Sequence, residues 1–325
     1  MPPSSQSGAS AALPTPARAG NPGDRAWGWG ITIFGGALLV VAGLILYELG
    51  RVAEPAWKHL GLVKFLLSSD WDPVQEKFGA LPFIYGTLVT SGLALVIALP
   101  VSVGLALFLS EMGPRALRVP VAYSIEVLAA IPSVIYGLWG LFVLVPWLRS
   151  SVQPFLQQTL GFLPIFKGPP IGLGYMAAGV ILALMILPTI ASVTIEVLKT
   201  VPPALKEGAL ALGATRWESI RISVLPYARP GIIGASLLGL GRALGETMAV
   251  TMVIGNTPQI SLSLLSPAYT MPSVIANEFA EATSTLHSSA LMEIGLILLV
   301  VTLIINVIAR FLVWSVTKGQ TKGVV

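Results

Sequence analysis

The sequence predicts an all-α protein, a polytopic bundle of six transmembrane helices. Hydrophobic residues make up 54% of the chain and charged residues only 10%, whereas soluble domains carry about 25% charged residues. The mean hydropathy is +0.82, and no soluble fold could bury this much apolar surface. Six separate apolar stretches are each long enough to cross a bilayer as a helix.

The expected spans follow one another with short connections. Residues 1–26 are rich in Ala, Ser, Pro and Gly and are expected to form a flexible cytoplasmic tail rather than a cleaved signal peptide. Residues 27–325 then form the transmembrane domain. The second and third spans contain Pro100 and Pro132, at which we expect bends. The six spans are predicted at 27–49, 82–110, 120–148, 173–198, 231–255 and 290–316.

The distribution of lysine and arginine predicts the orientation, because cytoplasmic loops carry an excess of both. Twelve fall on one side of the predicted topology: Arg18, Arg25, Arg115, Arg118, Lys199, Lys206, Arg216, Arg221, Arg229, Arg310, Lys318 and Lys322. Six fall on the other: Arg51, Lys58, Lys64, Lys77, Arg149 and Lys167. Both termini are therefore predicted to be cytoplasmic.

Several classes of site are disfavoured by composition. Cysteine is absent, so disulfides, thiolate metal sites and thiol catalysis are excluded. Only His59 and His287 could supply imidazole, and they lie far apart in the sequence, so no metal site is expected. The net charge of +4 is spread as a topology signal without a basic, aromatic-rich stripe, so no nucleic-acid partner is expected.

Arg242 and Glu246 are the most informative residues, because they lie inside the apolar run 232–254. A charge in hydrocarbon is costly and usually faces a bundle interior or a wet pathway. Arg242 is about 15 Å of helix from the end of its segment, too far to snorkel to water. At i and i+4 on one helix face the two side chains can meet. They are assigned to the substrate pathway, and a structural ion pair that fixes helix packing is the alternative.

Other intramembrane residues have simpler interpretations. Gly241 and Gly245 form a small-x-x-x-small pair, which favours close approach of another helix. Glu293 lies close to an outer helix end and is expected to reach the interface. Glu278 and Glu281 could meet an extracytoplasmic partner, but a solvated helix face explains them equally well.

The connection at about 198–230 is the longest cytoplasmic one and carries helix signals. Pro202 and Pro203 suit a first helical turn, and Gly213 can end that helix in a left-handed cap. Thr215 and Glu218 then fit a capping box, which starts a second short helix expected to end before Pro226. The resulting knob is shaped to enter a cleft on a soluble partner; the alternative is an interfacial helix pair resting on lipid.

The knob resembles the EAA loop of ABC-importer permeases, whose pattern is E-A-A, three residues, Gly, nine residues, Ile, one residue, Leu-Pro. Ser223 replaces the expected isoleucine, and Gly208 replaces the second residue of the pattern. In that family the loop docks on the ATP-hydrolysing subunit, so the resemblance implies ATPase coupling through Glu207, Gly208, Ala209, Gly213, Leu225 and Pro226. The chain has no Walker A motif of its own, so the ATPase is expected to be a separate chain.

A closer resemblance surrounds the charged pair. The stretch 239–250 reads G-L-G-R-A-L-G-E-T-M-A-V, the stretch 128–140 reads L-A-A-I-P-S-V-I-Y-G-L-W-G, and the stretch 276–282 reads A-N-E-F-A-E-A. Together they resemble the PstC-type permease family of high-affinity phosphate ABC importers, over about residues 80–315. The resemblance implies a type I ABC importer permease fold (MetI-like), and it associates Arg242 and Glu246 with transport.

The resemblance also implies function and partners. It implies a multi-pass subunit of an ATP-driven phosphate importer in a bacterial plasma (inner) membrane, which binds no cofactor and carries no catalytic residues of its own. Its implied partners are a second homologous permease, a dimer of ATP-binding subunits, an extracytoplasmic phosphate-binding protein and membrane lipid. A single-chain secondary transporter coupled to ions is the alternative. A membrane enzyme has little support, because no His, Cys or carboxylate cluster is found.

Overall fold

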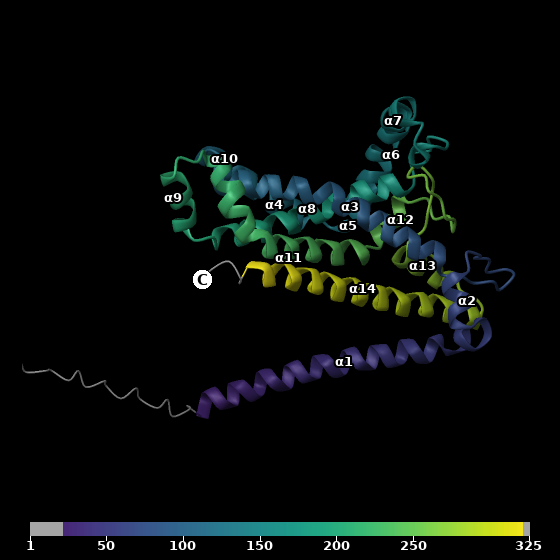
Figure 1. The fold of residues 1–325 in the computed structure, drawn as a ribbon. Coiled ribbons are helices and arrows are strands. Elements are labelled where there is room, and N and C mark those ends of the chain that lie inside the picture. The colour runs from purple at the N-terminus through teal and green to yellow at the C-terminus, as the bar shows by residue number, and fades with distance from the viewer. Residues whose placement is uncertain (1–21, 321–325) are drawn as a thin grey trace, which may run out of the picture. The chain divides into compact units, whose positions relative to one another are not determined.

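The computed structural model describes residues 22–320, which are almost entirely helical (Figure 1). Within that range no strand is formed, and Asp72 and Lys77 make only an isolated bridge. Five of the described helices are long and apolar enough to cross a membrane: Ala26–Leu60, Leu81–Met112, Ser133–Leu160, Tyr175–Lys199 and Thr285–Ser315. The predicted all-α membrane architecture is confirmed, with five uninterrupted spans in place of the six expected.

Helix α1 (Pro22–Leu60) begins earlier than the first expected span. Proline is well suited to the first position of a helix, where its missing N–H costs nothing. Residues 22–26, expected in the tail, are therefore helical, and the remainder of that predicted tail lies outside the described residues. The chain divides into two compact units within this helix, one ending at Glu48 and the other beginning at Leu49.

Helix α8 (Tyr175–Lys199) is the centre of the second unit. It packs along α3 (Leu81–Leu107) and α11 (Leu225–Leu244). Small residues allow these helices to approach closely, as is common in membrane bundles. Ala94 and Ala98 on α3 are fully buried, and a Cβ atom at Gly239 of α11 would lie 2.6 Å from Ile190 Cγ1 on α8.

The third expected span is not one helix. Helix α4 (Arg115–Ala130) ends before Pro132, and α5 (Ser133–Trp139) starts after it. Ile131 is extended, with φ −68° and ψ 126°, because a proline disfavours the helical conformation of the residue before it. The spanning helix then continues through η2 (Gly140–Leu144), α6 (Val145–Trp147) and η3 (Leu148–Val152) to α7 (Gln153–Leu160). Pro132 therefore breaks the helix instead of bending it.

The fifth expected span is also interrupted. Helix α11 ends at Leu244, and the short helix α12 (Met248–Val253) follows after three non-helical residues. Gly245 has φ −95° and ψ 0°, a conformation outside the regular helix, and glycine is among the weakest helix formers. Because of this break the expected span 231–255 is not one continuous helix, which leaves five uninterrupted spans.

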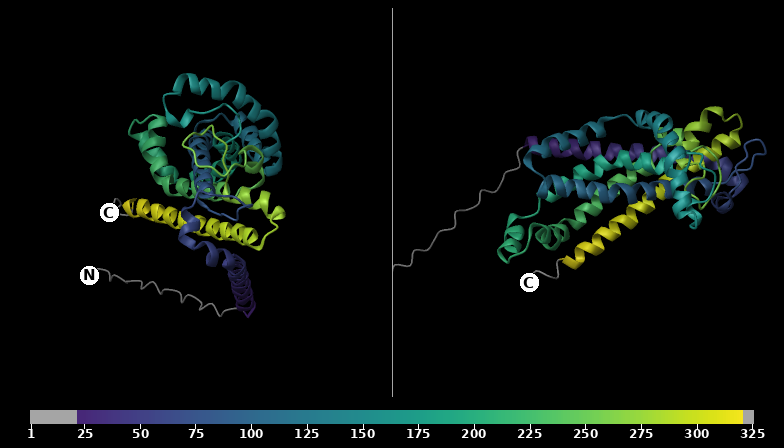
Figure 2. Two further views of the ribbon diagram at one scale, coloured as in Figure 1. Left: turned by 90° about the vertical axis from the view of Figure 1, so that its right-hand side faces the viewer. Right: turned by 90° about the horizontal axis from the view of Figure 1, so that it is seen from above.

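The remaining elements lie mainly at the two ends of the second unit (Figures 1 and 2). Helices α9 (Pro203–Ala211) and α10 (Arg216–Ser219) lie at the end where α14 (Thr285–Gln320) finishes. At the other end lie α2 (Leu62–Leu67), α7 and α13 (Met271–Glu278). The short helices η1 (Phe108–Met112), η4 (Pro164–Phe166), η5 (Ile220–Val224) and η6 (Phe279–Glu281) complete the described chain.

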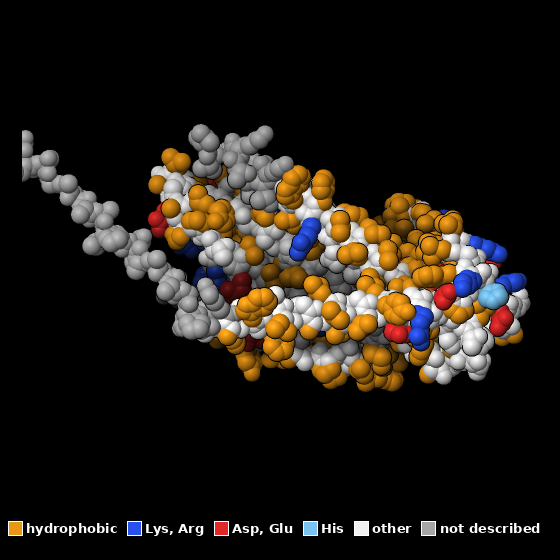
Figure 3. Space-filling model, turned by 90° about the horizontal axis from the view of Figure 1, so that it is seen from below, with side chains coloured by type: hydrophobic (Ala, Val, Ile, Leu, Met, Phe, Trp, Pro, Cys, Tyr) orange, Lys and Arg blue, Asp and Glu red, His pale blue; other side chains and the backbone are white. Residues whose placement is uncertain are grey.

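Hydrophobic side chains cover much of the face drawn in Figure 3, and charged ones gather mainly toward its two ends. This is the pattern of a surface that meets lipid in the middle and water at both ends.

Candidate functional site

Arg242 lies on the last turn of α11, beside α8. Its Nη1 atom donates a hydrogen bond to Thr189 Oγ1 at 3.3 Å, and the close approach of Gly239 to Ile190 holds the two helices together one turn away. The Arg242 side chain is exposed on the surface of this chain, and Thr189 is half-buried. A guanidinium has five N–H donors, so most of its binding capacity is available.

Glu246 is not the partner of Arg242. Among the described residues no ion pair joins them, although the sequence placed them on one helix face. The break after Leu244 is the physical reason, because residues on either side of it no longer follow the helical i, i+4 spacing. The predicted continuous helix through the pair is therefore wrong.

Glu246 instead caps the helix that follows. Its Oε1 atom accepts a hydrogen bond from the Ala249 N–H at 3.3 Å. The first N–H groups of a helix lack intrahelical partners and carry partial positive charge. A half-buried carboxylate at the start of α12 meets both needs, so the charge of Glu246 stabilises the break.

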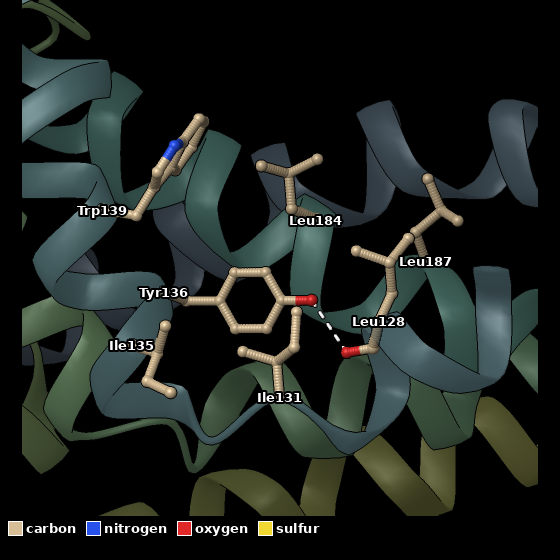
Figure 4. Close-up of a pocket in the computed structure, with 7 residues that line it drawn as sticks. All are labelled: Leu128, Ile131, Ile135, Tyr136, Trp139, Leu184 and Leu187. Carbon is tan, nitrogen blue, oxygen red and sulfur yellow. Dashed lines mark hydrogen bonds between the residues drawn. The ribbon is translucent and has the colours of Figure 1, made fainter.

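A cavity of about 400 Å³ lies beside the break between α4 and α5 (Figure 4). Its lining is apolar apart from the indole N–H of Trp139 and the hydroxyl of Tyr136, which donates to the Leu128 carbonyl oxygen at 2.8 Å. Among the described lining residues only the Trp139 indole N–H is a donor without a described partner, which is too little to bind an anion, and Arg242 does not line the cavity. The lining residues are Leu128, Ile131, Ile135, Tyr136, Trp139, Leu184 and Leu187.

The predicted coupling knob is formed by α9 and α10. Gly213 has φ +89° and donates its N–H to the Leu210 carbonyl, while Ala214 donates to Ala209. This pair of hydrogen bonds is a complete Schellman motif. The left-handed glycine cap that the sequence predicted is confirmed.

The capping box of the second knob helix is also confirmed. Thr215 Oγ1 accepts from the Glu218 N–H, and Glu218 Oε2 accepts from the Thr215 N–H at 2.8 Å. These hydrogen bonds from Thr215 lower the pKa of the Glu218 carboxyl. The carboxylate form is therefore favoured, and with it the start of α10.

The second knob helix does not end before Pro226, as the sequence had suggested. It continues through η5 into α11 as one helical segment. The Leu225 N–H donates to the Ile220 carbonyl, five residues back. Proline normally clashes with the helical turn before it, and the wider turn at η5 lets the chain pass this point without a break.

The six predicted coupling residues divide into two groups. Glu207 and Gly208 are exposed on α9, which buries none of its residues, and a Cβ atom at Gly208 would meet nothing within 4 Å. Ala209 is half-buried, and Gly213 forms the cap. Leu225 and Pro226 line a groove against α3 instead. Thus only the first four belong to the projecting knob.

Exposed apolar side chains surround Glu207. Leu205 and Leu210 on α9 are exposed, and Leu212 is 92% exposed. Lys206 fixes α9 to the bundle through an ion pair with Glu111 of η1. Grouped exposed leucines on an anchored projection are typical of a surface that binds another protein.

Comparison with known proteins decides the family. The sequence model of the family described as "Binding-protein-dependent transport system inner membrane component" matches residues 81–318. The chain belongs to that family. It is a multi-pass inner-membrane permease.

The permease is similar to several curated proteins over most of its length. It is 49% identical over 294 residues to the phosphate transport system permease protein PstC of Mesorhizobium japonicum, covering 87% of this chain and 90% of that protein. It is 52% identical to the protein of the same name from Haemophilus influenzae, over 80% of this chain and 82% of that one. An archaeal relative, the probable PstC of Methanocaldococcus jannaschii, is 38% identical over 85% of this chain and 90% of that one.

Solved structures support the fold of the permease. A bacterial ABC transporter involved in alginate import has a chain that matches with a TM-score of 0.61 at 20% identity, covering 90% of this chain and 99% of that one. The same transporter in complex with an alginate-bound periplasmic protein has a chain that matches with a TM-score of 0.61 at 21% identity, covering 90% of this chain and 96% of that one. The predicted type I importer permease fold is confirmed.

The structure adds a polar cluster at the other end of the permease that the sequence did not predict. Glu278 Oε2 accepts a hydrogen bond from Trp71 Nε1 at 2.9 Å and lies 3.2 Å from His287 Nε2. The ring of Phe78 stacks on His287. Glu278 is therefore tied to the loop after α2, rather than lying on the solvated face that the sequence had left open for it.

Tyr269 is buried deeply enough for its pKa to change. Burial raises the pKa of Tyr269 to about 12, and Asn277 Nδ2 donates to its hydroxyl oxygen at 2.8 Å. The end of α13 is thus tied to Tyr269 by a neutral hydrogen bond.

One further intramembrane expectation is wrong. Glu293 does not reach the interface: it is 1% exposed, and neither carboxyl oxygen has a hydrogen-bond partner. A Cβ atom at Gly241 would meet nothing within 4 Å, so no helix of the described chain packs closely there, and the close approach expected at Gly241 and Gly245 stays a prediction. Two other glycines of α11 pack closely against α8: Gly231 meets Val197, and Gly239 meets Ile190.

Proposed function

We propose that this permease is the membrane subunit of an ATP-driven phosphate importer. Relatives that share about half of its residues over more than four-fifths of its length are named as phosphate transport permeases. The observation that carries the proposal is Arg242, a guanidinium on a membrane helix whose described hydrogen-bond partner is a neutral hydroxyl. Arginine offers planar paired donors to phosphate oxygens.

In this proposal Arg242 and Glu246 have different tasks in the pathway. Arg242 receives the passing anion, because no carboxylate among the described residues neutralises it. Glu246 keeps α12 in place by capping its first turn. A fixed negative charge bonded to a helix N-terminus repels phosphate less than a free carboxylate, because the partial positive charge of the helix end offsets it.

The energy comes from a partner in this proposal. The knob of α9 and α10 docks on a separate ATP-binding subunit through Glu207, Gly208, Ala209 and Gly213, while Leu225 and Pro226 transmit the movement into α11. The surface around Glu207 supports this contact, because it is apolar, exposed and anchored to the bundle by Lys206. The permease then binds no ATP and catalyses no reaction itself.

The proposed assembly contains two permeases, an ATP-binding dimer and an extracytoplasmic phosphate-binding protein. A periplasmic protein accompanies one of the structurally similar transporters. Arg242 is exposed on this chain, and a second, homologous permease that faces it would enclose the pathway. The knob end is assigned to the cytoplasm together with both termini. The coupling segment at about 198–230 remains part of one transmembrane domain from residue 27 to 325.

Reconstitution of the complex tests the proposal. Proteoliposomes that contain the permease and its co-purified subunits are loaded with ATP and given labelled phosphate or sulfate with the binding protein. We expect uptake of phosphate that requires ATP hydrolysis. Uptake driven by a proton gradient with the permease alone would instead establish the secondary transporter, and ATP-driven uptake of sulfate in preference to phosphate would assign another oxyanion.

A further inference from the structure

Two arginines near the knob, to which the proposed transport function gives no role, share one groove. Arg221 of η5 and Arg229 of α11 both line a groove of about 570 Å³ between α11 and α3. Both side chains are exposed, and neither takes part in a described ion pair. An uncompensated pair of positive charges in one groove has to be explained.

The wide turn of η5 explains why the two arginines share a face. Eight residues of regular helix would turn the second side chain about 80° away from the first. The Leu225 N–H, however, donates to the Ile220 carbonyl five residues back, so this turn holds about one extra residue. Arg229 is therefore rotated back toward the side of Arg221, at most about 12 Å along the helix axis.

The rest of the groove is apolar. Leu99 and Val103 of α3 form one wall, and Ile232 and Ile233 of α11 extend the other. Val101 and Ile222, each next in sequence to a residue that lines the groove, are exposed hydrophobics, as expected of side chains that meet hydrocarbon. The groove thus has a cationic part beside the knob and an apolar part that runs along the spanning helices.

We propose that this groove binds an anionic glycerophospholipid, with its phosphodiester between Arg221 and Arg229 and an acyl chain along Leu99, Val103 and Ile232. Positive residues near the membrane surface attract anionic lipid, and basic pockets between membrane helices bind such headgroups. The assignment does not depend on which solute the permease transports.

The apolar walls favour a lipid over a free inorganic anion. A phosphate ion in the groove would lose hydration against Leu99, Val103 and Ile233 and regain donors only from two arginines, which leaves some of its oxygens unsatisfied. A phospholipid places hydrocarbon on those walls and only its headgroup at the arginines. Because Leu225 and Pro226 also line the groove, the bound lipid contacts the helix start that links the knob to α11.

Native mass spectrometry of the purified complex tests the proposal. The complex is incorporated into nanodiscs of phosphatidylcholine mixed with phosphatidylglycerol, and the lipid retained after release is counted. We expect wild-type complex to retain phosphatidylglycerol selectively. The double variant Arg221→Gln with Arg229→Gln should retain about thirty-fold less, which corresponds to about 1 kcal/mol for each arginine.

Matched variants separate this site from general charge. Arg216→Gln removes an equal charge from the same helical segment outside the groove and should leave retention unchanged. The pair Arg221→Lys with Arg229→Lys preserves the charge and should keep most of the phosphatidylglycerol, which also controls for assembly.

Three results would overturn the proposal. They are equal retention by the double Gln variant, equal retention of phosphatidylcholine and phosphatidylglycerol by the wild type, and displacement of phosphatidylglycerol by inorganic phosphate. The last result would assign the groove to a free anion. Lipid retention is measured without transport, so failure here leaves the transport proposal untouched.

Discussion

Arg242 Nη1 of α11 and Thr189 Oγ1 of α8 lie 3.3 Å apart in a hydrogen bond that crosses between two helices of the bundle. The contact orients the guanidinium without neutralising it, since a hydroxyl carries no charge. Glu246, four residues later, bonds to the Ala249 N–H instead. The charged pair in the sequence is thus two separate groups in the structure, a helix cap and a cation that has no ion-pair partner among the described residues.

Glu246 is expected to act through hydrogen bonding at the start of α12. Glu246→Ala removes the acceptor for the Ala249 N–H and should lower the stability of the purified complex by about 1 kcal/mol, the usual cost of a lost cap. Glu246→Gln keeps an acceptor oxygen and should lose less. Thermal unfolding in detergent measures both variants. If Glu246→Gln is as destabilised as Glu246→Ala, the negative charge at the helix end, and not the hydrogen bond, stabilises the start of α12.

Glu207 is expected to contact the ATP-binding subunit. Glu207→Arg reverses a charge at the exposed centre of α9 and should weaken co-purification of the ATPase about ten-fold or more, since like-charge contacts at an interface cost several kcal/mol. Glu76→Arg makes the same charge change at an exposed position in the loop after α2 and is the control. Unchanged ATPase recovery with Glu207→Arg would argue against docking at this surface.

The capping box at the start of α10, the second helix of the knob, should open at acid pH. Hydrogen bonds from Thr215 lower the pKa of Glu218 below its ordinary value of 4.5. A lowered folded-state pKa stabilises the folded form above the ordinary pKa, and that contribution disappears as the pH falls through the lowered value. The protection factor of the Thr215 amide, which is the ratio of its intrinsic to its observed hydrogen-exchange rate, should therefore be higher near neutral pH and fall at acid pH.

Glu218→Gln is the control for this pH effect. Glutamine can still complete a capping box but does not titrate, so the acid-dependent opening should disappear. An identical acid response in Glu218→Gln would show that another group is responsible.

The buried carboxyl group of Glu293 is expected to lower the stability of the folded protein. Its carboxyl oxygens are buried without a hydrogen-bond partner, and a buried polar group without a partner costs about 1–3 kcal/mol on scales from protein mutation. Glu293→Met is apolar and similar in length, so it should raise the unfolding temperature of the complex while preserving uptake. Loss of uptake with retained stability would instead assign Glu293 a role in transport.

Local patterns were predicted well from the sequence. The left-handed cap at Gly213 and the capping box of Thr215 and Glu218 depend on residues a few positions apart, so residue types and spacing suffice. Apolar length likewise predicted an all-α membrane bundle. The same reasoning failed at Pro132 and Gly245, where average hydropathy remains high through residues whose backbones leave the helix.

Relations between distant segments could not be predicted. Trp71 and Glu278 are separated by 207 positions, and nothing in either segment alone specifies the hydrogen bond between them. Gly239 packs against α8 while Gly241 does not, because the rotation of α11 is set by its neighbours. Arg221 and Arg229 share a groove only because η5 changes the helical register.

The uptake rate of the assembled Arg242→Ala complex tests the central claim most directly. Arg242→Ala should abolish ATP-driven phosphate uptake while the permease, ATPase and partner subunit still co-purify in wild-type proportions. Arg242→Lys should transport poorly, because a point charge cannot make the paired contacts of a guanidinium. Wild-type phosphate uptake by the Ala variant would contradict a role for Arg242 in the pathway, and failure of the variant to assemble would identify Arg242 as a structural residue.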